Sequence, residues 1–111
     1  MKLSVKLFLL SLIMFAKLSW GGESSGLVTY IYVHTPNILM FQAGTQNAPA
    51  GCSKYNQWAI SLDDPMGKPL YALLLSAQAQ GKPVYIKGYS NTCQAWDDRE
   101  LPSYGVIDAT K

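Results

Sequence analysis

The sequence has little of what most metal and catalytic sites require. Its 111 residues include two cysteines and a single histidine, His34. There is no CxxC pair, and one histidine with two cysteines falls short of the four ligands of a structural zinc site. The acidic pairs Asp63-Asp64 and Asp97-Asp98 lack the spacing of an EF-hand calcium loop. We therefore expect no bound metal and no cofactor, with Asp64 capping a helix and Asp97-Asp98 in a solvated loop.

A catalytic arrangement is also missing from the sequence. His34 would need a nucleophile or an acid as its partner, and no recognisable arrangement surrounds it. Two adjacent carboxylates cannot flank a glycosidic bond from both sides. We predict that the protein is not an enzyme and that His34 is a turn or surface residue.

No apolar run approaches the roughly twenty residues of a membrane-spanning helix. Instead, a short basic start is followed by about ten apolar residues, which is typical of a secretory signal peptide. Small residues follow at Ser19, Gly21 and Gly22. We predict a signal peptide over residues 1–21, cleaved after Gly21 or within a few residues of it; an uncleaved anchor is the alternative. The mature chain should be secreted or periplasmic, with no membrane span.

Positive charge is scarce once the leader is removed. The whole chain has nine Lys and Arg against seven Asp and Glu, but three of the lysines lie in the leader. Six cations against seven acids leave the mature chain with a net charge of −1. Nucleic-acid binding requires a concentrated positive surface, so we predict no nucleic-acid partner.

The two cysteines, Cys52 and Cys93, most simply form a disulfide in an exported domain of this size. The closed loop of about forty residues would stabilise the fold by roughly 3–4 kcal/mol in the chain-entropy treatment. A metal pair and two free thiols are the alternatives.

The mature part, residues 22–111, is expected to be a single domain with five strands and one helix. Residues 22–26 are small and polar and suggest a disordered start. Stretches rich in β-branched and aromatic residues predict the strands. The strands are expected at 27–34, 38–43, 55–62, 83–89 and 104–108, and the helix at 68–80. This β-β-β-α-β-β order is that of the OB-fold, a five-stranded Greek-key barrel, and an open α+β sheet is the alternative.

The predicted helix has clear signals at both ends. Asp64 followed by Pro65 suits a helix start, and Gly81 suits a helix end. One apolar stripe repeats at helical spacing. The stripe consists of Leu70, Leu73, Leu74 and Ala77.

Aromatic residues occur at alternating strand positions. Tyr30 and Tyr32 are expected to share a face with Val28 and His34, in a core or a subunit interface. Trp58 shares its face with Ile60 and is expected in the core.

Several segments together resemble a known group of proteins. They are Cys52, the helix PLYALLLSA at 69–77, the strand GKPVYI at 81–86, and Cys93. Over residues 50–95 the chain resembles small secreted bacterial OB-fold proteins, including the binding subunits of pentameric A–B toxins of the subtilase-cytotoxin type. The resemblance implies glycan binding, a ring-shaped homopentamer and a Gram-negative source. It assigns no binding residue.

The loop before the last strand combines aromatic and polar residues. In OB-folds this loop commonly shapes the ligand face. In a ligand-binding role, Trp96 would stack on a sugar ring and its polar neighbours would supply directed hydrogen bonds. The predicted ligand-binding residues are Trp96, Asn91, Asp97, Arg99 and Tyr89. For Trp96 we favour the other interpretation, in which it covers the disulfide and closes the barrel, because buried aromatic residues are common in small cores.

These features predict a secreted, non-enzymatic binding module. Its partner would be a glycan, as for a toxin-type binding subunit, or another protein. In the second case the chain would be a small periplasmic or extracellular accessory or inhibitor protein. A homo-oligomer is a further candidate state, and it would be a pentamer in the toxin-like case.

Overall fold

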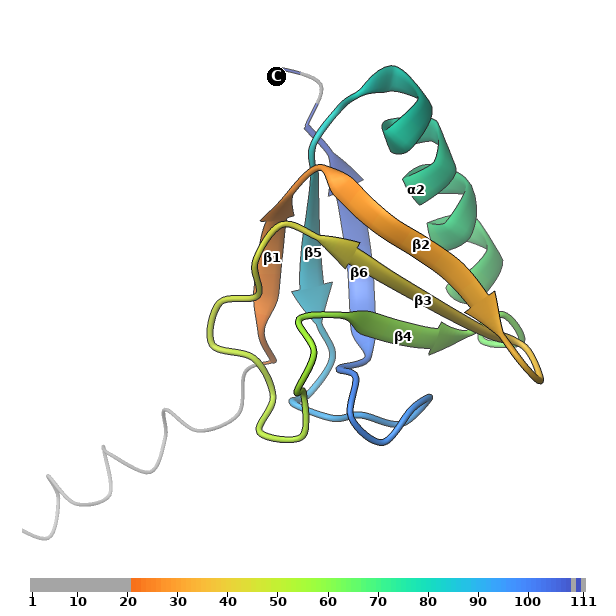
Figure 1. Ribbon diagram of the computed structural model, residues 1–111, viewed down its shortest axis with the longest axis vertical. Coiled ribbons are helices and arrows are strands. Elements are labelled where there is room, and N and C mark those ends of the chain that lie inside the picture. The colour runs from red at the N-terminus through yellow and green to blue at the C-terminus, as the bar shows by residue number, and fades with distance from the viewer. Residues whose placement is uncertain (1–20, 109, 111) are drawn as a thin grey trace, which may run out of the picture.

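The computed structural model describes residues 21–108 and Thr110, so residues 1–20 of the expected leader lie outside the described part. The described chain is mainly β, with two three-stranded antiparallel sheets and one helix (Figure 1). The first sheet has the order β1-β5-β6, with β1 Glu23–Gly26, β5 Val84–Gly88 and β6 Pro102–Ile107. The second has the order β2-β3-β4, with β2 Val28–His34, β3 Ile38–Ala43 and β4 Trp58–Ser61.

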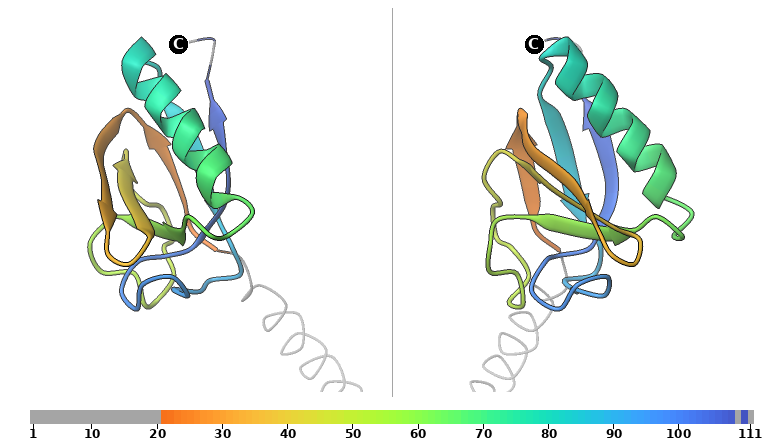
Figure 2. Two further views of the ribbon diagram at one scale, coloured as in Figure 1. Left: turned by 90° about the vertical axis from the view of Figure 1, so that its right-hand side faces the viewer. Right: turned by 45° about the vertical axis from the view of Figure 1, so that its right-hand side comes forward.

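The helix α2 runs over Gly67–Gln80 and begins one residue before its predicted start. Gly81 ends it in the left-handed conformation, at φ 65°, which glycine adopts without a Cβ penalty. The predicted stripe faces the core: Leu70, Leu74 and Ala77 are buried, and Leu73 packs against them. The helix lies along the side of the molecule against β6 and β2 (Figure 2).

The core lies between the two sheets and the helix. Phe41, Trp58 and Val84 are fully buried within it. The indole Nε1 of Trp58 donates a hydrogen bond of 3.0 Å to Ser24 Oγ, so the buried N–H has a partner on the opposite sheet. The prediction of Trp58 and Ile60 as core residues on one strand face is confirmed.

A bulge changes the face predicted for the start of β2. The register shifts between Val28 and Tyr30. Val28 is buried in the core and Ile31 packs against it, whereas Tyr30 points to the outside and is 60% exposed. The prediction that Val28 shares a face with Tyr30 and Tyr32 is wrong, because the extra residue of a bulge reverses the alternation. Tyr30 therefore has no core role, and Tyr32 is half-buried against a smaller outer cluster.

The polar start of the domain is ordered, contrary to expectation. The segment 23–26 is the strand β1, and Ser24 pairs with Ile86 of β5. The expectation of a disordered start at residues 22–26 is wrong because backbone pairing does not require apolar side chains. The last strand also starts two residues earlier than predicted, at Pro102.

The second sheet is joined to the segment before β6. Trp58 and Glu100 form an isolated parallel bridge, and the Ala59 N–H donates a hydrogen bond of 3.0 Å to the Glu100 carbonyl. Only Leu27 separates β1 from β2. One chain segment thus contributes a strand to each sheet.

The predicted disulfide is confirmed, since Cys52 and Cys93 are bonded with their Cα atoms 6.2 Å apart. Within residues 21–108 and Thr110, no helix has the length and apolar character needed to cross a membrane.

Candidate functional site

The predicted binding loop joins β5 to β6 and lies at the end of the molecule opposite the C-terminus (Figure 1). Two backbone hydrogen bonds, each 2.8 Å long, hold the base of the loop together. The Tyr89 N–H donates to the Leu101 carbonyl, and the Leu101 N–H donates to the Thr92 carbonyl. The disulfide fixes Cys93 of this loop to Cys52 of the loop between β3 and β4. A rigid scaffold therefore supports this irregular segment.

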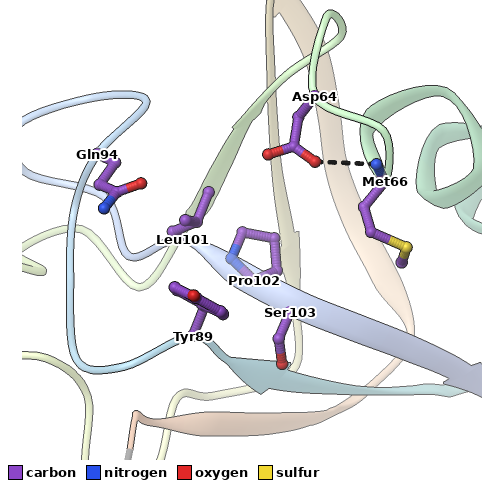
Figure 3. Close-up of a pocket in the computed structure, with 7 residues that line it drawn as sticks. All are labelled: Asp64, Met66, Tyr89, Gln94, Leu101, Pro102 and Ser103. Carbon is purple, nitrogen blue, oxygen red and sulfur yellow. Dashed lines mark hydrogen bonds between the residues drawn. The ribbon is translucent and has the colours of Figure 1, made fainter.

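A hollow of about 400 Å³ opens between this loop and the turn before α2. We call it the central hollow (Figure 3). Its lining residues are Asp64, Met66, Tyr89, Gln94, Leu101, Pro102 and Ser103. Ligand sites in proteins commonly enclose about 300–1,000 Å³, so the central hollow is at the small end of that range.

The lining of the central hollow combines an apolar floor with polar walls. Leu101 and Pro102 are buried, and the ring of Tyr89 beside them is 52% exposed. Asp64 accepts the Met66 N–H at 2.9 Å through Oδ1, and its second carboxylate oxygen is turned toward the side of the hollow where Gln94 lies (Figure 3). The ring of Tyr89, the amide of Gln94 and a carboxylate oxygen of Asp64 therefore surround the central hollow.

Two further hollows adjoin the central one. The second, of about 330 Å³, shares Gln94 with it and is lined by Cys93, Gln94, Ala95, Trp96 and Asp97. The third, of about 350 Å³, shares Tyr89 and Ser103 with it and is lined by Gly21, Lys87, Gly88, Tyr89, Ser90, Ser103 and Tyr104. Because the central hollow shares lining residues with each of the other two, the three adjoin, and we call them together the loop groove. Of the five predicted ligand-binding residues, the groove contains Tyr89, Trp96 and Asp97.

Trp96 is half-buried and contributes to two environments. Its ring lies 4.7 Å from the ring of His34, tilted by 59°. It also packs against the outer cluster of Ile38, Met40 and Ala59. Trp96 therefore covers the outside of the second sheet while it lines the second hollow.

Arg99 lies outside the loop groove, in a polar network with the second sheet. Its guanidinium contacts the Asp98 carboxylate, and its Nε donates to Gln57 Oε1 at 3.2 Å. It lies 4.4 Å above the ring of Tyr55, a cation–π contact. Tyr32 also donates to Gln57 Oε1, at 2.9 Å. Burial lowers the pKa of Arg99, but the interactions with Asp98 and, to a lesser extent, Tyr32 together outweigh it, so the net shift of the pKa is upward.

Asn91 contributes to the turn and lines none of the three hollows. Ser90 and Asn91 both have positive φ angles, 47° and 57°. Asn tolerates this left-handed conformation better than most residues, which accounts for its position here.

The third hollow borders a hydrogen-bonded pair on the outside of the first sheet. Tyr85 donates its hydroxyl to Glu23 Oε2 at 2.5 Å. That hydrogen bond is the main cause of a raised Tyr85 pKa of about 12 and, with the charge of Lys87, of a lowered Glu23 pKa. Lys87 Nζ itself donates to the Gly21 carbonyl at 3.0 Å.

His34 and Asp63 contact the turn that joins β2 to β3. His34 Nδ1 lies 2.8 Å from the Thr35 carbonyl, and Asp63 accepts a hydrogen bond of 2.9 Å from Asn37 Nδ2. No group of three or more potential metal ligands occurs in the described part of the chain.

Sequence reasoning missed Gln94, Ser103 and Asp64 as groove residues. Gln94 lies within the predicted loop, and its polar side chain was the only feature of the sequence that could have marked it as a groove residue. In the structure this side chain is exposed. Asp64 lies thirty positions earlier, and only the packing of the turn before α2 against β6 brings it to the groove.

Comparisons with known proteins add no relative: no protein-family model, no curated protein and no solved structure matches this chain.

Proposed function

We propose that this protein is a secreted or periplasmic, non-enzymatic binding module that recognises a glycan in the loop groove. The observation that carries the proposal is the exposed ring of Tyr89 in the central hollow, with Gln94 and Asp64 beside it. A sugar ring presents an apolar face and a rim of hydroxyls. Tyr89 supports contact with the face, while amide and carboxylate groups are suited to the hydroxyls.

The dimensions of the groove favour a short oligosaccharide. Each hollow is near the lower limit of a ligand site, and two of them adjoin the central one. Aromatic rings at two separate places, Tyr89 and Trp96, would allow more than one sugar unit to bind. Asp64 and Asp97 add negative charge to the central and second hollows. We therefore expect a neutral glycan whose hydroxyls donate hydrogen bonds to these carboxylates.

We also propose that the two sheets are parts of one OB-like barrel. Support comes from the pairing circuit: β1 and β2 are consecutive, β2 pairs with β3, β3 with β4, and β6 and β5 lead back to β1. The remaining junction is the parallel bridge between Trp58 and Glu100. In this arrangement the loop groove occupies the loop end of the barrel, a common ligand position in OB-folds.

A glycan array screened with the exported, labelled protein tests the proposed function. We expect binding to a small set of neutral oligosaccharides and at least tenfold weaker binding for Tyr89→Ala. Tyr30→Ala is the matched control, because Tyr30 is similarly exposed but lies outside the three hollows. Binding to no glycan, or equal losses in the two variants, would contradict the proposal.

A protein partner is the second candidate. Outside the loop groove, the exposed rings of Tyr30 and Tyr55 and the guanidinium of Arg99 offer residue types that are enriched at protein-binding hot spots. An accessory or inhibitor protein would lose its partner in Tyr55→Ala and keep it in Tyr89→Ala, measured by co-purification from the culture supernatant. A toxin-type subunit would instead be a homopentamer by light scattering.

A further inference from the structure

Glu100 is the one carboxylate in the described chain that is fully buried, at 0% exposure. Its Oε2 accepts the Gly22 N–H at 2.7 Å, and its Oε1 accepts the Ala50 N–H at 2.5 Å. Both oxygens accept hydrogen bonds, which suits an ionised carboxylate. No cationic side chain within residues 21–108 forms an ion pair with it.

A buried charge without a counter-ion is costly, and such groups are normally paired. The position of Gly22 suggests where the counter-ion comes from. Gly22 is the residue that follows the expected leader, and Ser19 and Gly21 provide the small residues of a signal-peptidase site. The group that donates to Glu100 is therefore the nitrogen that leader removal would free.

We infer that hydrolysis of the Gly21–Gly22 peptide bond creates the counter-ion of Glu100. Water adds across the bond at the active site of a signal-type endopeptidase. The carboxylate stays on Gly21 with the leader, and the freed amine of Gly22 takes up a proton. The resulting α-ammonium stands where the amide nitrogen stood, 2.7 Å from Glu100 Oε2. This inference rests on the expected leader and is independent of the proposed ligand.

The space around the Glu100 carboxylate leaves no room for side chains at positions 22 and 88. A Cβ on Gly22 would lie 2.7 Å from the Cα of Pro49 and 2.9 Å from Glu100 Oε1. A Cβ on Gly88 would overlap Glu100 Oε2, and the Gly88 N–H donates to the Gly22 carbonyl at 2.7 Å. A side chain at position 22 would therefore have to displace the segment at Pro49 or the carboxylate itself.

Through this ion pair, removal of the leader would affect the stability of the whole domain. Glu100 touches the start of β1, the loop that contains Ala50, the end of β5 and, through its carbonyl, β4. The precursor lacks the positive charge at this junction, so the domain reaches its full stability only after the leader has been removed. The cleavage would also remove Gly21 from the third hollow and free Lys87 from the Gly21 carbonyl.

The first test is the mature terminus of the full chain, expressed with its leader in an exporting bacterium. Intact mass and N-terminal sequencing should give a protein that starts at Gly22. A start at any other residue, or retention of the leader, would overturn the inference.

The second test is the pKa of the α-amine in the exported protein, followed by NMR with nitrogen-15-labelled glycine. Burial alone lowers the pKa of an amine, whereas an ion pair raises it. We expect a pKa at least one unit above the ordinary range of about 7.7–8.0. Besides Glu100, the charged groups are Glu23 on β1, Lys87 on β5, and Asp97, Asp98 and Arg99 beside Glu100 in the chain, of which Asp98 and Arg99 pair with each other. The segment 44–51 has none.

Variants separate the ion pair from other causes. Glu100→Gln should bring the α-amine pKa back to the ordinary range or below it. Glu23→Gln is the control, because Glu23 is adjacent in the chain but bonds to Tyr85, and the raised pKa should persist. If Glu100→Gln does not fold, the wild-type titration decides alone, and an unshifted or lowered pKa overturns the inference. A pKa that stays raised in a folded Glu100→Gln protein also overturns it.

Discussion

Removal of the disulfide should cost this small domain a large part of its stability. Cys52 and Cys93 are 41 residues apart in the sequence, and their bond joins two irregular loops that are also linked by the hydrogen bond of 3.0 Å from the Lys54 N–H to the Asp98 carbonyl. The chain-entropy treatment gives about 4 kcal/mol for a closed loop of this length. Domains are typically stable by about 5–15 kcal/mol, so the double variant Cys52→Ala/Cys93→Ala should be only marginally folded at 25 °C.

Urea unfolding of the exported protein, followed by tryptophan fluorescence, measures this loss. For a domain of this size about 4 kcal/mol corresponds to a melting temperature lower by roughly 15–30 °C. Ser53→Ala, in the same loop, is the control: its hydroxyl donates to Gln46 Oε1 at 2.8 Å, and its loss should cost about 1 kcal/mol or less. A double variant within about 1 kcal/mol of the wild type would refute the entropic reasoning.

Other predictions follow from the packing and the charges. Gly88→Ala forces a Cβ into the Glu100 carboxylate and should cost about 3 kcal/mol in chemical unfolding, whereas Gly51→Ala, with nothing within 4 Å of the new Cβ, should stay within about 0.5 kcal/mol. The lowered pKa of Glu23 stabilises the fold above its ordinary pKa of 4.5, and this contribution disappears as the pH falls through the lower folded-state value. The raised pKa of Tyr85, about 12, stabilises the fold up to pH 10, and this contribution disappears between pH 10 and 12. Tyr85→Phe should therefore flatten the acid limb of a stability–pH curve and remove one late-titrating phenol from the absorbance titration; unchanged curves would contradict the pairing.

The elements marked by a periodic pattern of apolar residues could be predicted from the sequence. Alternation placed Trp58 in the core, and the helical stripe placed Leu70 and Leu74 there. The strand β1 could not be found in this way, since its pairing partner β5 lies about sixty residues away and its own residues have little strand preference. The bulge near Val28 was also hidden, because it arises from pairing rather than from composition.

The residues of the candidate site could be predicted from the sequence only in part, like the fold. The aromatic and polar composition of one loop pointed to Tyr89, Trp96 and Asp97, which line the groove. Composition could not show that Arg99, in the same loop, lies outside the groove. The Arg99 side chain instead forms a hydrogen bond with Gln57, just before β4. A sequence lists the residues of a loop, but the direction of each side chain depends on what the loop packs against.

Ligand mapping by NMR tests the binding proposal most directly. A glycan found on the array would be titrated into the nitrogen-15-labelled exported protein. We expect chemical-shift changes for the Gln94 side-chain amide and the Trp96 indole N–H, while the indole N–H of Trp58, buried and bonded to Ser24, stays unchanged. Shifts confined to the face of Tyr30 and Tyr55, with Gln94 and Trp96 unmoved, would contradict it.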